Sequence, residues 1–194
     1  CGITQYIRYT GEGEPLVNPH TFEMLAYAVV RSNTTVSLTT NGVLLNDKRI
    51  EQLLATRVNV VDISIDAFRP ETYAKIRVNG DLDVTRGNVL RLLRKTKENG
   101  GATKIVVSYV EQPLNQNETR DFEGFWKDHG ADYVVIRRLH TNAGSMTAIA
   151  ERLAKEKPLQ LWRPCLYPWE RLSMNPQGHI LFCPVDWIHG SFVS

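Results

Sequence analysis

The chain has 194 residues, of which 42% are hydrophobic and 23% charged, a composition typical of a globular protein with one substantial core. Its net charge of +2 is too small, and its Lys and Arg residues are too scattered, to indicate a nucleic-acid partner. No apolar run approaches the roughly 20 residues that span a bilayer, and no secretory leader is visible. The three cysteines are too few and too far apart for a secreted disulfide framework, which fits a reducing compartment, and they form no CxxC pair. We therefore expect a cytoplasmic protein without a membrane partner.

The chain opens with a predicted strand, turn and helix. Residues 5–10 form a β-type run. Asn18 and Pro19 are typical of a helix cap followed by a first-turn proline. Four residues then share one face of the predicted helix: Phe22, Leu25, Ala26 and Val29.

The same unit recurs three times along the chain, and a fifth strand follows. Further strands are predicted at 34–40, 58–66, 104–110 and 132–139, and the run 58–66 is apolar enough to be buried on both faces. Four helical stretches separate or follow these strands: one with Ile50, Leu53 and Leu54, one opening at Pro70, one with Val89, Leu92, Leu93 and Thr96, and one capped by Asn117 with Phe122, Phe125 and Trp126. Such alternation predicts an α/β fold with parallel strands, either an open doubly wound sheet or a (β/α) barrel.

Polar residues follow each predicted strand. In both candidate folds ligands bind beyond the carboxyl ends of the strands, so these residues are expected to form one polar rim. They are Glu12 and Glu14, Thr40 and Asn41, Ser64 and Asp66, Glu111, and Arg138 and His140.

The loop after the first strand carries glycines and glutamates. Gly11 and Gly13 fit the first two glycines of a dinucleotide-binding loop, but Leu16 stands at the third position, and the glutamates would repel a pyrophosphate. A cationic amine is a better complement, because Gly13 lets backbone carbonyls approach closely and Glu14 adds negative charge. The simpler alternative is a turn with Glu14 near a helix N-terminus.

The composition changes after residue 157 to a stretch rich in Pro and Trp. A β-hairpin is predicted over 171–183, with Cys165 before it and Cys183 at the end of its second strand. We therefore expect two domains, 1–157 and 158–194.

Three motifs, TGEGEPL (10–16), LTTNGVLL (38–45) and VVDISIDAFRPETYAKIR (60–77), resemble conserved elements of the radical S-adenosylmethionine (SAM) enzymes in order and spacing. The similarity is greatest to the branch with the molybdopterin-precursor cyclase and the maturases that carry a SPASM extension. The resemblance implies a partial (β/α)6 TIM-like barrel, truncated at its N-terminus, with a C-terminal β-hairpin extension. It also implies an oxidoreductase or maturase in which a reduced [4Fe-4S] cluster cleaves SAM, and the resulting 5'-deoxyadenosyl radical abstracts a substrate hydrogen.

The resemblance also implies roles for particular residues. The family's CxxxCxxC cluster loop is not in these 194 residues, so we expect it upstream of Cys1, with the chain a fragment that is inactive alone. The SAM-binding positions carried over are Gly13 and Glu14 for the methionyl amino group, Thr40 and Asn41 near the methionyl end, and Ser64 and Asp66 for the ribose hydroxyls.

Cys165 and Cys183 match the Cys-x(12)-Gly-x(4)-Cys opening of SPASM or twitch extensions. The match implies that both thiolates bind an auxiliary iron–sulfur cluster. Buried thiols or half of a zinc site are the alternatives.

The implied partners are a peptide, protein or small-molecule substrate and a reductant such as flavodoxin or ferredoxin. No residue is singled out for the chemistry on the substrate. The alternative function, from a different class, is a non-catalytic barrel-like binding scaffold.

Overall fold

The computed structural model describes residues 4–11, 13–139, 166–181, 183 and 192–193. The chain divides into two compact units, 1–138 and 139–194, which are described separately. The expected domain boundary after residue 157 lies outside the described residues and stays a prediction.

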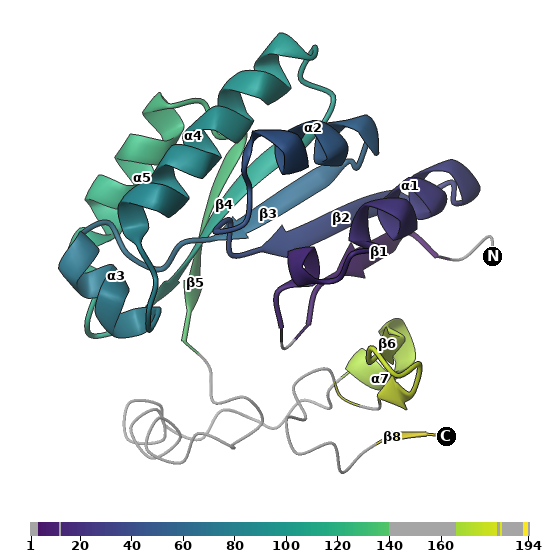
Figure 1. The fold of residues 1–194 in the computed structure, drawn as a ribbon. Helices are drawn as coiled ribbons and strands as arrows, with labels where there is room; N and C mark the ends of the chain where they lie inside the picture. The colour runs from purple at the N-terminus through teal and green to yellow at the C-terminus, as the bar shows by residue number, and fades with distance from the viewer. Residues whose placement is uncertain (1–3, 12, 140–165, 182, 184–191, 194) are drawn as a thin grey trace. The chain divides into compact units, whose positions relative to one another are not determined.

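The first unit is built on a parallel sheet with the strand order β1-β2-β3-β4-β5 (Figure 1). Sequential order decides between the two expected folds, because a doubly wound sheet reverses its order at a switch point and a barrel does not. The α/β fold is therefore confirmed as the partial TIM-barrel-like type, with no closed barrel among the described residues. All five predicted strands are present: β1 (Tyr6–Tyr9), β2 (Thr35–Thr40), β3 (Val60–Ser64), β4 (Lys104–Glu111) and β5 (Tyr133–Arg138).

Helices follow the strands as expected, but two predicted caps are wrong. Asn18 is not the N-cap of α1; it is the C-cap of η1, its Oδ1 accepts from the backbone N–H of His20, 2.9 Å away, and His20 occupies the N-cap position of α1. Asn117 lies inside a 3₁₀ turn, and Glu118 occupies the cap position of the helix that follows. The helical elements are η1 (Pro15–Val17), α1 (Thr21–Arg31), α2 (Asp47–Ala55), α3 (Pro70–Ile76), α4 (Leu82–Glu98), η2 (Gln116–Glu118) and α5 (Thr119–Asp128).

The two faces of the sheet differ in character. Helices α2, α4 and α5 lie over one face (Figure 1), where alternate strand residues such as Leu38, Ile63 and Val107 are fully buried. The strand register places the intervening residues on the opposite face. We call this opposite face the polar face, because its residues include Arg8, Ser37, Thr39, Asp62, Ser64, Ser108 and Arg137. The prediction that the 58–66 run is a strand buried on both faces is confirmed for the centre of β3, because Val61, Asp62 and Ile63 are all buried.

The second unit contains a short helix, α7 (Tyr167–Glu170), and a small antiparallel sheet. The predicted hairpin is confirmed by β6 (Ser173–Met174) pairing with β7 (Ile180–Leu181). A third strand, β8 (Phe192–Val193), pairs with β7 and was not expected from the sequence. Across the described parts of both units, no helix is long and apolar enough to cross a membrane.

Tyr109 on β4 gives the first unit a defined response to alkaline pH. Its ring is fully buried against Phe122, and its hydroxyl donates to the backbone oxygen of Asn115, 2.6 Å away. Burial raises the pKa of Tyr109 to about 12 from its ordinary value near 10. The unfolded chain therefore releases this proton first, so stability that is intact below pH 10 is expected to fall as the pH rises towards about 12.

Urea denaturation at several pH values tests this expectation. The free energy of unfolding of the wild type should fall more steeply between about pH 10 and 12 than that of Tyr109→Phe, which lacks the ionisable hydroxyl. Equal slopes for the two proteins would contradict the assignment.

Candidate ligand site at the carboxyl edge of the sheet

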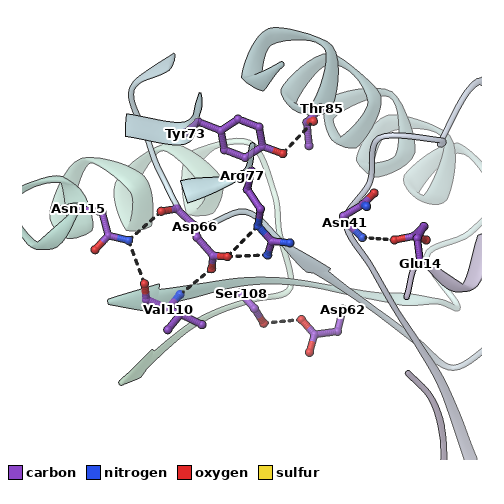
Figure 2. Close-up of polar contacts among 10 residues, drawn as sticks. All are labelled: Glu14, Asn41, Asp62, Asp66, Tyr73, Arg77, Thr85, Ser108, Val110 and Asn115. Carbon is purple, nitrogen blue, oxygen red and sulfur yellow. Dashed lines mark hydrogen bonds and ion pairs between the residues drawn. The ribbon is translucent and has the colours of Figure 1, made fainter. Parts of the chain in front are cut away.

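Glu14 joins the loop after β1 to the end of β2. Its Oε1 accepts from Thr40 Oγ1 at 2.6 Å and from the Leu16 N–H at 3.1 Å. Its Oε2 accepts from the Asn41 N–H at 2.8 Å (Figure 2). Three of the residues predicted to bind a ligand are thus brought together. Because a carboxylate oxygen has two lone pairs, one acceptor position remains on Oε2.

The end of β2 is held in place around Asn41. The buried Thr40 hydroxyl accepts from the Gly42 N–H at 3.2 Å, and Asn41 Oδ1 accepts from the Val43 N–H at 3.0 Å. Asn88 on α4 donates to the backbone oxygens of Gly42 and Val43. Gly42 has a φ of +76°, a conformation that favours glycine. Among the described residues, Asn41 Nδ2 has no hydrogen-bond partner and stays available as a donor.

Ser64 and Asp66 lie at the end of the neighbouring strand β3. The half-buried Ser64 hydroxyl has no hydrogen-bond partner within the described part of the chain. Asp66 is buried, and its Oδ1 accepts from the Val110 N–H at 2.8 Å. Its Oδ2 accepts from Arg77 Nε at 3.0 Å and Nη2 at 2.5 Å (Figure 2). One acceptor position therefore remains on Asp66 Oδ1.

The loop between β1 and η1 leaves room for a ligand. A Cβ atom added at Gly11 or at Gly13 would meet no atom within 4 Å. Gly13 is exposed, and Glu12 lies outside the described residues. Backbone groups near Gly13 can therefore be approached closely.

The other members of the expected rim contribute less. Glu111 accepts from the Thr119 hydroxyl at 2.8 Å, and Arg138 is exposed. His140 lies outside the described residues. Among the described residues, the open hydrogen-bonding positions identified above follow β1, β2 and β3, and these form the candidate ligand site.

Sequence reasoning missed Asp62 at the centre of the polar face. Its Oδ2 accepts from Arg8 Nη2 on β1 at 3.0 Å and from Arg137 Nη2 on β5 at 2.9 Å. Its Oδ1 accepts from the Ser108 hydroxyl on β4. The signal was present, because Asp62 and Ser64 alternate with apolar residues, as in a strand with one polar face.

Replacing Asp62 with Ala is expected to lower the free energy of unfolding by about 2 kcal/mol, because two arginines lose the carboxylate that they share. The loss is smaller than for a fully buried ion pair because both arginines are partly exposed to water. The Asp62 side chain is 9% exposed, against 38% and 40% for Arg8 and Arg137. Urea denaturation measures the loss. The matched control is Glu98→Ala, which removes a 64% exposed carboxylate 3.8 Å from Arg94 and should change stability by less than about 0.5 kcal/mol. Equal effects would contradict the role given to Asp62.

The described residues contain no group of three or more His, Cys, Asp or Glu side chains that could hold a metal ion. Cys183 is half-buried with a free thiol, and Cys1 and Cys165 lie outside the described residues. The expected cluster site at Cys165 and Cys183 therefore stays a prediction. The 194 residues also lack a CxxxCxxC run, so this chain does not supply that ligand set.

The fold and its edge define a partial (β/α) barrel protein, a class in which ligands bind at the carboxyl ends of the strands. Residues 2–110 match the sequence profile of the Radical SAM superfamily, and the chain belongs to that superfamily.

Several curated relatives are similar over part of their length. A Methanocaldococcus jannaschii protein named "Probable GTP 3',8-cyclase" is 30% identical over 124 residues, which cover 64% of this chain and 40% of that protein. The GTP 3',8-cyclase of Mycobacterium sp. (strain KMS) is 31% identical over 144 residues, covering 73% of this chain and 39% of that protein. The chain thus spans about two fifths of the length of these relatives.

Solved structures share the fold. Streptococcus suis SuiB bound to the precursor peptide SuiA superposes with a TM-score of 0.58 at 15% identity, covering 78% of this chain and 34% of SuiB. SuiB has also been solved bound to S-adenosylmethionine, and superposes with a TM-score of 0.55 at 12% identity, covering 78% of this chain and 35% of that one. Archaeal TYW1 superposes with a TM-score of 0.52 at 15% identity, covering 78% of this chain and 50% of that one.

Proposed function

We propose that the intact protein is a radical SAM enzyme, and that the carboxyl edge of this sheet binds SAM. The observation that carries the proposal is the unused hydrogen-bonding capacity of the edge. Glu14 Oε2 and Asp66 Oδ1 each retain an acceptor position, Asn41 Nδ2 retains its donors, and the Ser64 hydroxyl has no partner among the described residues. These groups complement an ammonium, a carboxylate and a ribose.

Each group has a place in this proposal. The methionyl ammonium lies against Gly13, where there is open space, and against the free position on Glu14. The methionyl carboxylate accepts from Asn41 Nδ2. Thr40 acts indirectly, because its hydroxyl already donates to Glu14 and accepts from Gly42.

The ribose hydroxyls bind at the end of β3. Ser64 can donate or accept, whereas ionised Asp66 can only accept. Arg77 and the Val110 N–H hold the Asp66 carboxylate in one orientation, so it meets the ribose without first having to be ordered.

When bound in such enzymes, SAM supplies a 5'-deoxyadenosyl radical that removes a hydrogen atom from the substrate. The cluster that would donate the electron needs a CxxxCxxC set of thiolates, which these 194 residues do not contain. What this chain contributes is the binding and orientation of SAM.

We also propose a domain division, an auxiliary cluster site and partners for the intact enzyme. Residues 1–157 form the partial barrel, and residues 158–194 begin a SPASM or twitch region in which Cys165 and Cys183 bind an auxiliary iron–sulfur cluster. The intact enzyme is a cytoplasmic oxidoreductase or maturase. It receives electrons from a flavodoxin or ferredoxin and modifies a peptide, a protein or a small molecule.

Anaerobic reconstitution of the intact protein with iron and sulfide tests the proposal. The protein is expected to become brown and to convert SAM into 5'-deoxyadenosine when dithionite is added. A colourless protein that leaves SAM unchanged would overturn the proposal and support the binding scaffold instead.

A further inference from the structure

The segment that joins β3 to α3 is held by side chains from two later elements. Two donors of its backbone, the N–H groups of Phe68 and Arg69, are bound by Glu118. The backbone oxygen of Asp66 accepts from Asn115, and that of Phe68 accepts from Arg86 Nη2 at 2.6 Å.

Glu118 is buried, with 3% of its surface exposed, although it carries a carboxylate. Its Oε2 accepts from the Phe68 N–H at 2.8 Å and the Arg69 N–H at 2.9 Å, and its Oε1 accepts from the Thr72 hydroxyl. These donors lie at and just before the first turn of α3, where helix N–H groups lack partners within the helix. Glu118 thus caps α3 from 46 to 50 residues further along the chain.

Asn115 is fully buried and ties the same segment to β4. Its Nδ2 donates to the backbone oxygen of Asp66 at 2.8 Å and of Val110 at 2.9 Å (Figure 2). Its Oδ1 accepts from the Gln112 N–H at 2.7 Å. Val110 in turn donates its N–H to the Asp66 carboxylate. Asn115 therefore binds the backbone of Asp66, Val110 binds its side chain, and Asn115 and Val110 are bonded to each other.

Burying an amide and a carboxylate is unfavourable unless their hydrogen bonds are satisfied. The hydrogen bonds of Asn115 and Glu118 connect the segment between β3 and α3 to the end of β4 and to η2. From this network we infer that Asn115 and Glu118 are positioning residues that hold Asp66 at the orientation in which it binds the SAM ribose. The inference rests on the proposed function, since it takes Asp66 as a SAM contact. Neither residue touches SAM; each acts through the 66–69 segment.

The test uses the intact, reconstituted protein and measures SAM affinity by calorimetry alongside amide hydrogen exchange. Glu118→Ala is expected to weaken SAM binding about tenfold, the scale of a lost supporting contact, and to speed exchange at Phe68 and Arg69. Glu118→Gln should stay within about threefold of the wild type, because its amide oxygen can still accept from both N–H groups. If Glu118→Ala does not fold, Glu118→Asp serves, with an intermediate loss expected.

The control separates positioning from stability. Thr103 is also buried, and its hydroxyl donates to the backbone oxygen of Val58 at 2.8 Å, next to the start of β3 and thus at the other edge of the sheet. Thr103→Val should lower the melting temperature but leave SAM affinity unchanged. The KM for SAM should rise in Glu118→Ala while kcat at saturating SAM changes less than about twofold.

Two different results would overturn the positioning role and the proposed function. Glu118→Ala with wild-type SAM affinity, while the wild type binds and cleaves SAM, would overturn the positioning role alone. A wild-type protein that binds no SAM, although Phe68 and Arg69 are protected from exchange, would overturn the proposed function on which the inference rests.

Discussion

Asp66→Ala is expected to weaken SAM binding by the intact protein about a hundredfold, which corresponds to roughly 2.7 kcal/mol and to the loss of one or two charge-assisted hydrogen bonds. The variant removes the acceptor proposed for the ribose. It also leaves the Arg77 guanidinium and the Val110 N–H without the carboxylate that pairs with both. The side chain is buried, so water replaces it poorly.

Asp66→Asn separates the loss of the proposed ribose acceptor from the loss of the charge that pairs with Arg77. Its amide oxygen can replace Oδ1 towards Val110 and the ribose, but its NH2 group faces the Arg77 donors. The expected loss is about tenfold, between wild type and Asp66→Ala. Calorimetric titration of each reconstituted variant with SAM measures these ratios. Wild-type affinity in Asp66→Ala would remove Asp66 from the site.

Glu14→Ala should have the second large effect, because one side chain holds two loops of the site together. The variant removes the acceptors for Thr40, the Asn41 N–H and the Leu16 N–H, so the loop after β1 is no longer attached to the end of β2. We expect a loss of about a hundredfold in SAM affinity and of about 2 kcal/mol in the free energy of unfolding. Calorimetry and urea denaturation measure the two losses.

Two further variants make this result specific. Glu14→Gln keeps an oxygen for Thr40 and Leu16 but presents an amide nitrogen to the Asn41 N–H, so it should fall between Ala and wild type. Glu23→Ala on α1 removes an 80% exposed carboxylate and should change neither measurement. If Glu14→Ala lost stability and kept its SAM affinity, the loop would be structural only.

Much of the fold could be predicted because its signals are local. The β-branched runs at 34–40 and 104–110 and the helical stripe of Val89, Leu92 and Leu93 each lie within a few residues. The alternation of strands and helices predicts an α/β fold with a parallel sheet, and parallel strands place their carboxyl ends at one edge of that sheet. The grouping of Glu14 with Thr40 and Asn41 followed from that rule.

The hydrogen-bond partners could not be predicted in the same way. Asp66 pairs with Arg77 and Val110, and Glu118 binds Phe68, at separations of 11 to 50 residues. Nothing in a single sequence links such positions, because the contacts depend on how the loops after neighbouring strands cross.

The two wrong caps have a similar cause. Asn18 and Asn117 both carry the side chain that a helix cap needs, but each lies in or beside a short turn that delays the helix. At the second site Glu118 takes the cap position, yet its carboxylate binds the N–H groups of Phe68 and Arg69 instead. A tertiary contact thus overrides a local preference.

A crystal structure of the intact protein with SAM, prepared without oxygen, tests the central claim most directly. We expect the methionyl ammonium at Gly13 and Glu14, the carboxylate at Asn41, and the ribose at Ser64 and Asp66. SAM bound with none of its atoms within hydrogen-bond distance of these residues would contradict the account.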